Sequence, residues 1–264
     1  MRLGVIGYGA IGRAVVDAWR GGELGPGIEL AAVLVQKPRP DERGLVITHD
    51  PDRFFARSQD VVLECAGHGA VRAHGIRCLE HGADLVLTSI GALTDDRLRN
   101  SLEAAAAGAG RKLIVASAGI GALDILSAAA IGGLERVAIT VRKDPSAWWG
   151  TAAEGLCDLA SLAAPVVLYR GPVREGAARY PQNVNIAAAV ALAGLGLDRT
   201  ELVIVADPSI RTHRVEIEAE GAFGRFSFTE EVEPTADNPK TGKLVAMAVI
   251  KTVRQLASPV VIGG

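Results

Sequence analysis

Apolar runs and amphipathic stretches alternate along the first 116 residues of the chain. Between the short apolar runs, leucine, alanine and arginine recur every three or four positions, which is the spacing of an amphipathic helix. This alternation is typical of β-α units around a parallel sheet. It predicts strands at Arg2–Ile6, Leu30–Val35, Asp60–Glu64, Asp84–Leu87 and Lys112–Val115, and helices at Ile11–Arg20, Ala70–His81 and Asp95–Ala109.

The pattern changes after Ser117. In the run His213–Glu220, Val215, Ile217 and Ala219 alternate with charged residues, which predicts an antiparallel strand with one face in water. The rest of this half predicts helices at Leu123–Ile131, Val184–Leu195 and Lys240–Leu256, strands at Val137–Lys143, Glu201–Ala206 and Arg225–Glu231, and a passage rich in glycine and proline at Arg170–Pro181.

Charge and composition exclude several classes of protein. The chain has 264 residues, of which 28 are basic and 30 acidic, so its formal net charge is −2. Sequence-independent binding of nucleic acid would require an excess of basic residues, so we expect no nucleic-acid partner. A hydrophobic content of 49% fits an ordered globular protein.

Cysteines and apolar stretches bear on the compartment. Cys65, Cys78 and Cys157 form no C-x-x-C pair, so we expect neither a disulfide framework nor a metal site. The longest apolar stretch, Ile186–Leu197, is too short to cross a bilayer, which takes about 20 residues. Met1 leads directly into a strand-like run, unlike a signal peptide. We therefore expect a cytoplasmic protein without a membrane partner.

A G-x-G-x-x-G motif at residues 7–12 follows the first predicted strand and opens the first predicted helix. In this setting Gly7 permits a tight turn, Gly9 lets the backbone approach a pyrophosphate, and Gly12 lets helix and strand pack closely. The motif predicts a site for NAD or NADP; a structural glycine turn is the alternative. The residues expected there are Gly7, Gly9, Ala10, Ile11 and Gly12.

The end of the second predicted strand bears on the choice of cofactor. An NAD enzyme normally places Asp or Glu here, to bind the adenosine ribose, but this chain has Gln36. With Lys37 and Arg39 nearby, we predict that NADP is accepted at least as well as NAD. Alternatively, the two cations only solvate a loop.

Two more turns follow predicted strands and consist of small residues, which would let a ribose lie close to the backbone. They are Cys65-Ala66-Gly67 and Ser117-Ala118-Gly119. Asn183 and Asn185 precede an alanine-rich helix, where they could cap it or offer amide groups to the cofactor.

Candidate chemistry comes from a histidine and a helix start. His213 follows a turn that contains Pro208, and an imidazole titrates near neutral pH, so it is the candidate general acid or base. Asn238-Pro239-Lys240-Thr241 is expected to open the last helix, where Asn238, Lys240 and Thr241 could bind a carboxylate. An ordinary asparagine cap is the alternative.

The segments GYGAIG, SAGIGALD, RKDP, YPQNVNIAAAVALAGLGLD, VIVADPSIRTHRVEI and NPKTGK resemble the L-aspartate dehydrogenase family over nearly the whole chain. The resemblance implies a homodimer that uses NAD(P) to deaminate L-aspartate oxidatively, through iminosuccinate, to oxaloacetate and ammonia. It implies that His213 is catalytic and that the cofactor contacts the glycine turn, Ser117-Ala118-Gly119, and Asn183 or Asn185. Two substrate carboxylates require cations and donors, and Lys143, Lys240 and Thr241 are available.

The chain departs from the family pattern at two places. Arg211 stands where an N-x-H pattern often has asparagine, and Asp144 stands where the first proline of an RKPP pattern is expected. Trp148 and Trp149 follow, and they either reshape the substrate pocket or pack as a pair.

Pattern and resemblance together predict an α/β protein with an N-terminal Rossmann domain, a doubly wound parallel sheet, and a second α+β domain with a mixed sheet. The expected boundaries are 1–120 for dinucleotide binding, 121–240 for substrate binding and oligomerisation, and 241–264 for a helix that packs back on the first domain. The alternative functions are a reductase of the dihydrodipicolinate-reductase or homoserine-dehydrogenase type, and a non-catalytic NAD(P)-binding sensor.

Overall fold

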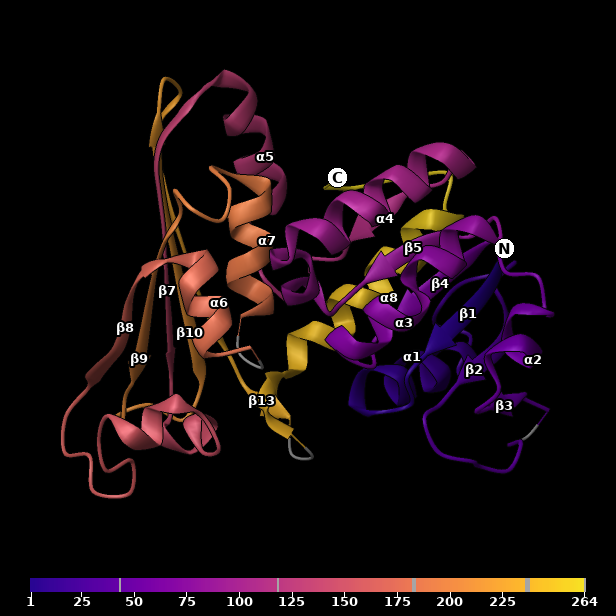
Figure 1. The fold of residues 1–264 in the computed structure, drawn as a ribbon, viewed down its shortest axis with the longest axis horizontal. Helices are drawn as coiled ribbons and strands as arrows, with labels where there is room; N and C mark the ends of the chain where they lie inside the picture. The colour runs from indigo at the N-terminus through magenta and orange to yellow at the C-terminus, as the bar shows by residue number, and fades with distance from the viewer. Residues whose placement is uncertain (43, 118, 182–183, 236–237, 264) are drawn as a thin grey trace. The chain divides into compact units, whose positions relative to one another are not determined.

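The computed structural model describes residues 1–42, 44–117, 119–181, 184–235 and 238–263 (Figure 1). The chain forms two compact units. Residues 1–116 and 246–262 build the first unit, and residues 117–245 build the second. The two units are described one at a time.

The first unit is built on a parallel sheet with the strand order β3-β2-β1-β4-β5-β6. This order confirms the predicted doubly wound sheet, and it reverses between β1 and β4. The five predicted strands are present, while the short β3 was not predicted. The strands are β1 (Arg2–Ile6), β2 (Glu29–Leu34), β3 (Ile47–Thr48), β4 (Val61–Glu64), β5 (Asp84–Leu87) and β6 (Leu113–Val115).

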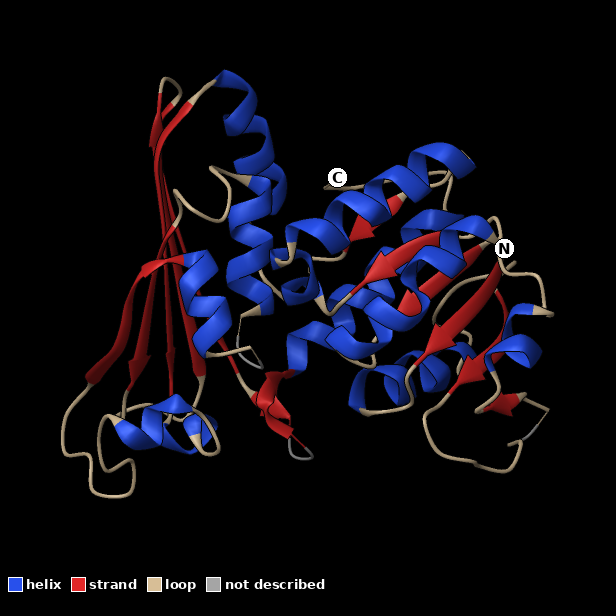
Figure 2. Cartoon of the chain, viewed as in Figure 1, coloured by secondary structure: helices blue, strands red, loops and turns tan. Residues whose placement is uncertain are grey.

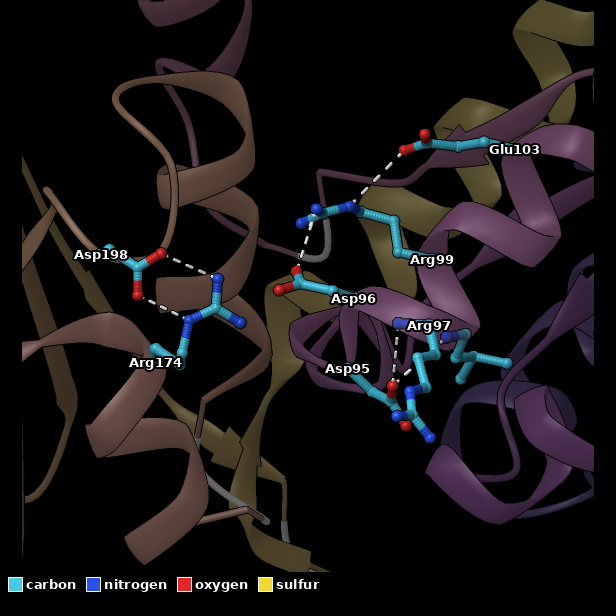
Figure 3. Close-up of polar contacts among 8 residues, drawn as sticks. Asp95, Asp96, Arg97, Arg99, Glu103, Arg174 and Asp198 are labelled. Atoms are coloured by element: carbon cyan, nitrogen blue, oxygen red, sulfur yellow. Dashed lines mark hydrogen bonds and ion pairs between the residues drawn. The ribbon is translucent and has the colours of Figure 1, made fainter.

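In the first unit, an aspartate side chain caps the start of α4 (Asp96–Ala109). At α4, the carboxylate of Asp95 accepts hydrogen bonds from the backbone N–H groups of Arg97 and Leu98, and Arg99 pairs with acidic residues one turn to either side (Figure 3). The helices are α1 (Ala10–Arg20), α2 (Pro51–Phe55), α3 (His68–Glu80), α4 (Asp96–Ala109) and α8 (Lys243–Ala257), with a 3-10 turn at Ile90–Thr94.

The core of the first unit draws on both ends of the chain. Val5 and Leu63 of the sheet and Val15 of α1 are fully buried, and Val249 and Val253 of α8 belong to the same cluster. Burial of a side chain of this size contributes about 1.5–3 kcal/mol. The last helix thus completes the first unit from Ala246 onward.

The second unit has a mixed sheet in the order β11-β10-β7-β9-β8, in which only β7 and β9 run parallel. In β10, Val215, Ile217 and Ala219 are buried while Glu218 and Glu220 are exposed, which confirms the predicted alternation. The strands are β7 (Leu134–Lys143), β8 (Val166–Pro172), β9 (Glu201–Ala206), β10 (His213–Gly221) and β11 (Gly224–Val232).

Three helices of the second unit lie on one face of this sheet (Figure 2). They are α5 (Leu123–Gly132), α6 (Val173–Arg179) and α7 (Asn185–Ala193), and short 3-10 turns lie at Pro145–Trp148 and Ala152–Gly155. The passage Arg170–Pro181, predicted only as rich in glycine and proline, instead contains the end of β8 and all of α6. Buried Val173 and a two-pronged ion pair between Arg174 and Asp198 (2.6 and 2.9 Å) fix this helix (Figure 3).

The predicted start of the last helix is wrong. Asn238–Gly242 forms β13, which pairs antiparallel with β12 (Pro234–Thr235), and α8 begins at Lys243. The backbone N–H of Lys243 donates to the carbonyl of Glu233 (2.8 Å), so the hairpin fixes this helix start. Pro239 has no N–H to donate, and a two-stranded hairpin tolerates this.

Within these described ranges, no helix is both long and apolar enough to span a membrane, and no three His, Cys, Asp or Glu side chains gather as a metal site would require.

Candidate active site

The turn between β1 and α1 brings backbone atoms unusually close together. Gly7 has φ +109°, which favours glycine, and a Cβ on Gly12 would lie 2.2 Å from the carbonyl oxygen of Gly7. Gly9 is the N-cap of α1, and among the described residues no side chain caps this helix start. Its N–H groups and the positive end of the helix dipole therefore form an anion site at the end of β1.

A cavity of about 920 Å³ lies at the carboxyl edge of the parallel sheet, beside this turn. It is lined by the ends of β1, β2 and β4 and by the first two turns of α3. Its volume is in the range of small-molecule and cofactor sites. Six of the predicted cofactor residues line it, namely Gly7, Gly9, Gln36, Lys37, Cys65 and Ala66; Ala10, Ile11, Gly12 and Gly67 adjoin these residues in sequence but do not line it.

The cavity wall carries basic and titratable side chains. Lys37, Arg39, His49 and His74 line it, and the described lining residues include no Asp or Glu. Sequence reasoning missed His49 and His74, because they come from a loop after β3 and from α3. Burial, with a smaller contribution from the nearby Arg77, lowers the pKa of His74. With Lys37 and Arg39 and no carboxylate among its described lining residues, the wall suits an anionic ligand.

Arg39 is held beside the cavity by two neighbours. Its guanidinium carbon lies 4.9 Å from the centroid of the Tyr8 ring, and it pairs with Glu42 at 3.5 Å. The Tyr8 hydroxyl donates to the same carboxylate (3.1 Å). Burial, followed by Glu42, raises the pKa of Tyr8, so the phenol remains a donor at neutral pH.

Cys65 is a packing residue rather than a nucleophile. Its thiol donates to the carbonyl of Ile6 (3.4 Å) and lies 3.6 Å from that of Gly7. Burial, with a smaller effect of Glu64, raises the pKa of this thiol far above neutrality. A thiolate is the reactive form, and it is disfavoured here.

In the second unit, His213 and Lys143 occupy neighbouring strand ends. In the antiparallel pair of β7 and β10, Arg142 lies opposite Arg214. Lys143 and His213 are the next residues of these strands toward the same edge of the sheet. Side chains of a strand point alternately to its two faces, so Lys143 lies on the same face as Val141, and His213 on the same face as Val215. The helices cover this face. The exposed fractions are only 4% for Lys143 and 7% for His213.

Two ion pairs fix the turn that precedes His213. Asp207 accepts from Arg142 (2.9 Å) and from the hydroxyl and N–H of Ser209, and Arg211 pairs with Asp144. Burial acts to raise the pKa of Asp207, but these bonds outweigh it and keep the carboxyl ionised. The two departures from the family pattern, Arg211 and Asp144, thus bind each other.

The two tryptophans do not pack as a pair. Trp148 is fully buried, with its ring at 82° to that of Tyr180, whereas Trp149 is 46% exposed. The ammonium of Lys143 lies 5.8 Å from the centroid of the Trp148 ring. A cation over an indole face at this distance is stabilised by the ring electrons, so Trp148 helps to hold Lys143 in position.

The remaining predicted residues also belong to the second unit. Ser117 and Gly119 precede α5, and Asn185 is the first residue of α7, whose N-cap Val184 makes no side-chain cap bond. The backbone of Asn238, Lys240 and Thr241 lies in β13, not at a helix start, and their side chains are not described. A Cβ on Gly242, the last residue of β13, would lie 3.8 Å from Nδ1 of His213, so this strand ends beside the imidazole. Ala118 and Asn183 lie outside the described residues.

Sequence reasoning also missed Glu230. This residue of β11 lies opposite Val215, on the same sheet face as His213, and it accepts a hydrogen bond from the N–H of Gly121. Burial raises the pKa of Glu230 to about 7. Nothing in the local sequence separates it from Glu231, which points to the other face and pairs with Arg214.

Comparisons with known proteins divide the chain at the same place. The family model described as "Homoserine dehydrogenase, NAD binding domain" matches residues 7–116, and the model described as "Aspartate dehydrogenase, C-terminal" matches residues 124–256. The first match contains the glycine turn and the cavity, and the second contains Lys143 and His213.

Similarity to named relatives extends over nearly the whole chain. The L-aspartate dehydrogenase of Ruegeria pomeroyi is 39% identical over 97% of this chain and 92% of its own length, and that of Pseudomonas aeruginosa is 39% identical over 96% of each. The crystal structure of aspartate dehydrogenase from Thermotoga maritima is 23% identical, with a TM-score of 0.78 over 100% of this chain and 99% of that one. This last likeness is one of fold.

Two substitutions in the glycine turn are expected to have different effects, one on cofactor binding and the other on stability. A Cβ on Gly9 would meet no atom within 4 Å, so we expect Gly9→Ala to keep the melting temperature and to weaken binding of NAD(P)H at least tenfold. Gly12→Ala should instead lower the free energy of unfolding by about 1–3 kcal/mol, because its Cβ collides with backbone. Thermal melts and NAD(P)H fluorescence titrations measure both effects. Normal cofactor binding by Gly9→Ala would contradict this assignment.

Glu230 makes stability depend on pH. Because burial raises its pKa, the side chain favours folding below pH 4.5, and this contribution is lost as pH rises through about 7. Glu230→Gln keeps the acceptor for Gly121 without the charge. We expect it to match the parent protein at pH 4 and to be more stable at pH 8 by about 1–2 kcal/mol, a value reduced for solvent screening. Denaturant titrations at the two pH values test this, with Glu231→Gln as the control.

Proposed function

Because the chain belongs to the L-aspartate dehydrogenase family, we propose that it catalyses the NAD(P)-dependent oxidative deamination of L-aspartate, through iminosuccinate, to oxaloacetate and ammonia. The chain is an NAD(P)-dependent dehydrogenase. The observation that carries the proposal for the substrate is the position of His213 and Lys143 at neighbouring strand ends, on one face of one sheet. A general base beside a buried cation is what an amino-acid substrate with two carboxylates requires.

The proton chemistry is assigned to His213. Bound NAD(P) supplies the hydride acceptor. The imidazole accepts a proton from the substrate ammonium group and releases it to solvent. It then accepts a proton from the water that attacks the imine carbon and returns it to the departing ammonia. The Arg142–Asp207 and Arg211–Asp144 pairs hold the preceding turn, and so orient the ring.

The substrate carboxylates are assigned to cations of the second unit. Lys143 is fixed over the Trp148 ring, so its ammonium binds a carboxylate with little loss of side-chain freedom. Asn238, Lys240 and Thr241 of β13 are assigned as further donors, supported by the position of Gly242 beside His213.

The cofactor is assigned to the cavity of the first unit. The pyrophosphate binds at the start of α1, and Gln36 and Lys37 bind the adenosine ribose and its substituent. The small residues Cys65, Ala66 and Gly67 are assigned to the nicotinamide half. For Ser117, Ala118, Gly119 and Asn183 or Asn185, contact with the cofactor is what the family resemblance implies. In this arrangement residues 1–120 bind the cofactor, residues 121–240 bind the substrate, and α8 belongs to the cofactor-binding unit.

Two further properties are part of the proposal. The protein acts as a homodimer, as the family resemblance implies, with the second unit contributing the interface. It acts in the cytoplasm, as the lack of a disulfide framework in its cysteine pattern indicates. Light scattering of the purified protein tests the dimer, and a monomeric mass under assay conditions would contradict it.

The substrate test combines an amino-acid panel with a variant. We expect NAD(P) reduction with L-aspartate and not with D-aspartate or homoserine. His213→Ala should lower kcat by about 10²–10⁴-fold, the range of general acid–base catalysis, and leave the Kd for NAD(P)H unchanged. Lys143→Met should mainly raise the KM for L-aspartate.

The control is His81→Ala, which removes an exposed histidine at the end of α3. It should keep full activity. Full turnover by His213→Ala would refute the catalytic assignment, and cofactor binding without turnover of any amino or hydroxy acid would favour a sensor.

The choice of cofactor is tested at the end of β2. Because Lys37 and Arg39 line a wall whose described residues include no carboxylate, we expect a KM for NADP no higher than that for NAD. Lys37→Gln with Arg39→Gln should raise the KM for NADP at least about tenfold, since each cation makes a charge-assisted bond to the 2′-phosphate, and should change the KM for NAD little. A strong preference of the parent enzyme for NAD would overturn this assignment.

A further inference from the structure

Glu64 is a buried carboxylate that the proposed chemistry does not use. It is the last residue of β4, next to the central strand of the first sheet, and only 1% of it is exposed. Burial of an ionised carboxylate is unfavourable unless hydrogen bonds satisfy its oxygens. A group of this kind at the edge of a cofactor cavity therefore requires an explanation.

Four hydrogen bonds satisfy this carboxylate. Oε1 accepts from the N–H groups of Ala66 (2.7 Å) and Gly67 (2.8 Å) and from the hydroxyl of Ser89 (2.9 Å), and Oε2 accepts from the N–H of Ser89 (3.2 Å). Burial raises the pKa of Glu64, and these bonds act against that rise. The backbone carbonyl of Glu64 accepts two further bonds from Thr88. The loops after β4 and β5 are thus joined through one residue.

Two helices of the first unit begin at the carboxyl edge of this sheet. Gly67 is the N-cap of α3, and its N–H donates to the carboxylate of Glu64, so this carboxylate fixes the turn that leads into α3. At both α1 and α3, no described side chain caps the helix start, and the first turn contains no acidic residue. Glu64 therefore holds the loop before α3 rather than capping the helix.

The cavity depends on the loop that Glu64 holds. Cys65 and Ala66 line the cavity directly beside the glycine turn, where a Cβ on Gly7 would lie 2.8 Å from the backbone of Cys65, and Gly69 and Ala70 line it from α3. Only a carboxylate can accept from all four donors, because the NH₂ of a glutamine would face the N–H of Ser89, and its single carbonyl oxygen would make weaker bonds to the other three. A loop with these bonds weakened would lose the fixed wall against which a dinucleotide packs.

We propose that Glu64 is a positioning residue for the cofactor: it fixes the loop Cys65–Gly67, which packs against the glycine turn and forms part of the cavity wall. This rests on the proposed binding of NAD(P) in the cavity. Since the pyrophosphate is common to both cofactors, loss of Glu64 affects NADH and NADPH equally, unlike changes at Lys37 and Arg39.

The test is Glu64→Gln, which has nearly the same size but no charge. We expect the Kd values for NADH and NADPH, from fluorescence titration, to rise about tenfold each. In the protein without cofactor, hydrogen exchange in peptides that contain Ala66, Gly67 and Ser89 should become faster. Glu80→Gln, an exposed change at the other end of α3, is the matched control and should alter neither measurement.

A milder variant keeps the proposal testable if Glu64→Gln does not fold. Ser89→Ala removes one of the four bonds and should raise both Kd values about two- to threefold, with faster exchange at Ala66 and Gly67. A folded variant with faster exchange and unchanged Kd values would overturn the positioning role. Failure of the parent protein to bind either cofactor would instead refute the proposed function.

Discussion

The close approach of α1 to the end of β1 is the constraint on which the cofactor-binding unit depends. Gly12 lies so near the carbonyl of Gly7 that no other residue fits without displacing backbone. This contact aims the start of α1 at the edge where the parallel strands end. Because β2 and β4 end at the same edge, their loops meet this helix start and form one cavity.

In the second unit, side chains rather than backbone contacts hold the site residues in position. His213 and Lys143 stand at the ends of neighbouring strands, one residue beyond the last residue pair between β7 and β10. Two arginine–carboxylate pairs hold the turn before His213, and the Trp148 ring holds Lys143. Arginine suits this task better than lysine, because its planar group binds a carboxylate in a defined geometry. Twenty-two of the 28 basic residues are arginines.

Charged groups at particular positions, rather than the net charge, determine the electrostatics of each site. With a net charge of −2, the protein as a whole gives little attraction to an anionic ligand. The first unit instead lines its cavity with Lys37 and Arg39, and it keeps Glu64 buried behind the loop, where four donors neutralise its effect. The second unit buries Lys143 beside an aromatic ring. In each unit, a few charged groups in fixed positions provide the attraction for an anionic ligand that the net charge of the protein does not provide.

Elements with local signals could be predicted from the chain alone. Apolar runs and the glycine motif predicted the parallel strands, and alternation predicted β10, because side chains repeat with the period of the element that carries them. Contacts between distant residues set the other features. β3 and the start of α8 depend on pairing partners, Glu230 and Glu231 differ only by sheet face, and Ser89 reaches Glu64 from 25 residues away. Such contacts leave no pattern in the chain, since they form only when distant loops meet at one edge of a sheet.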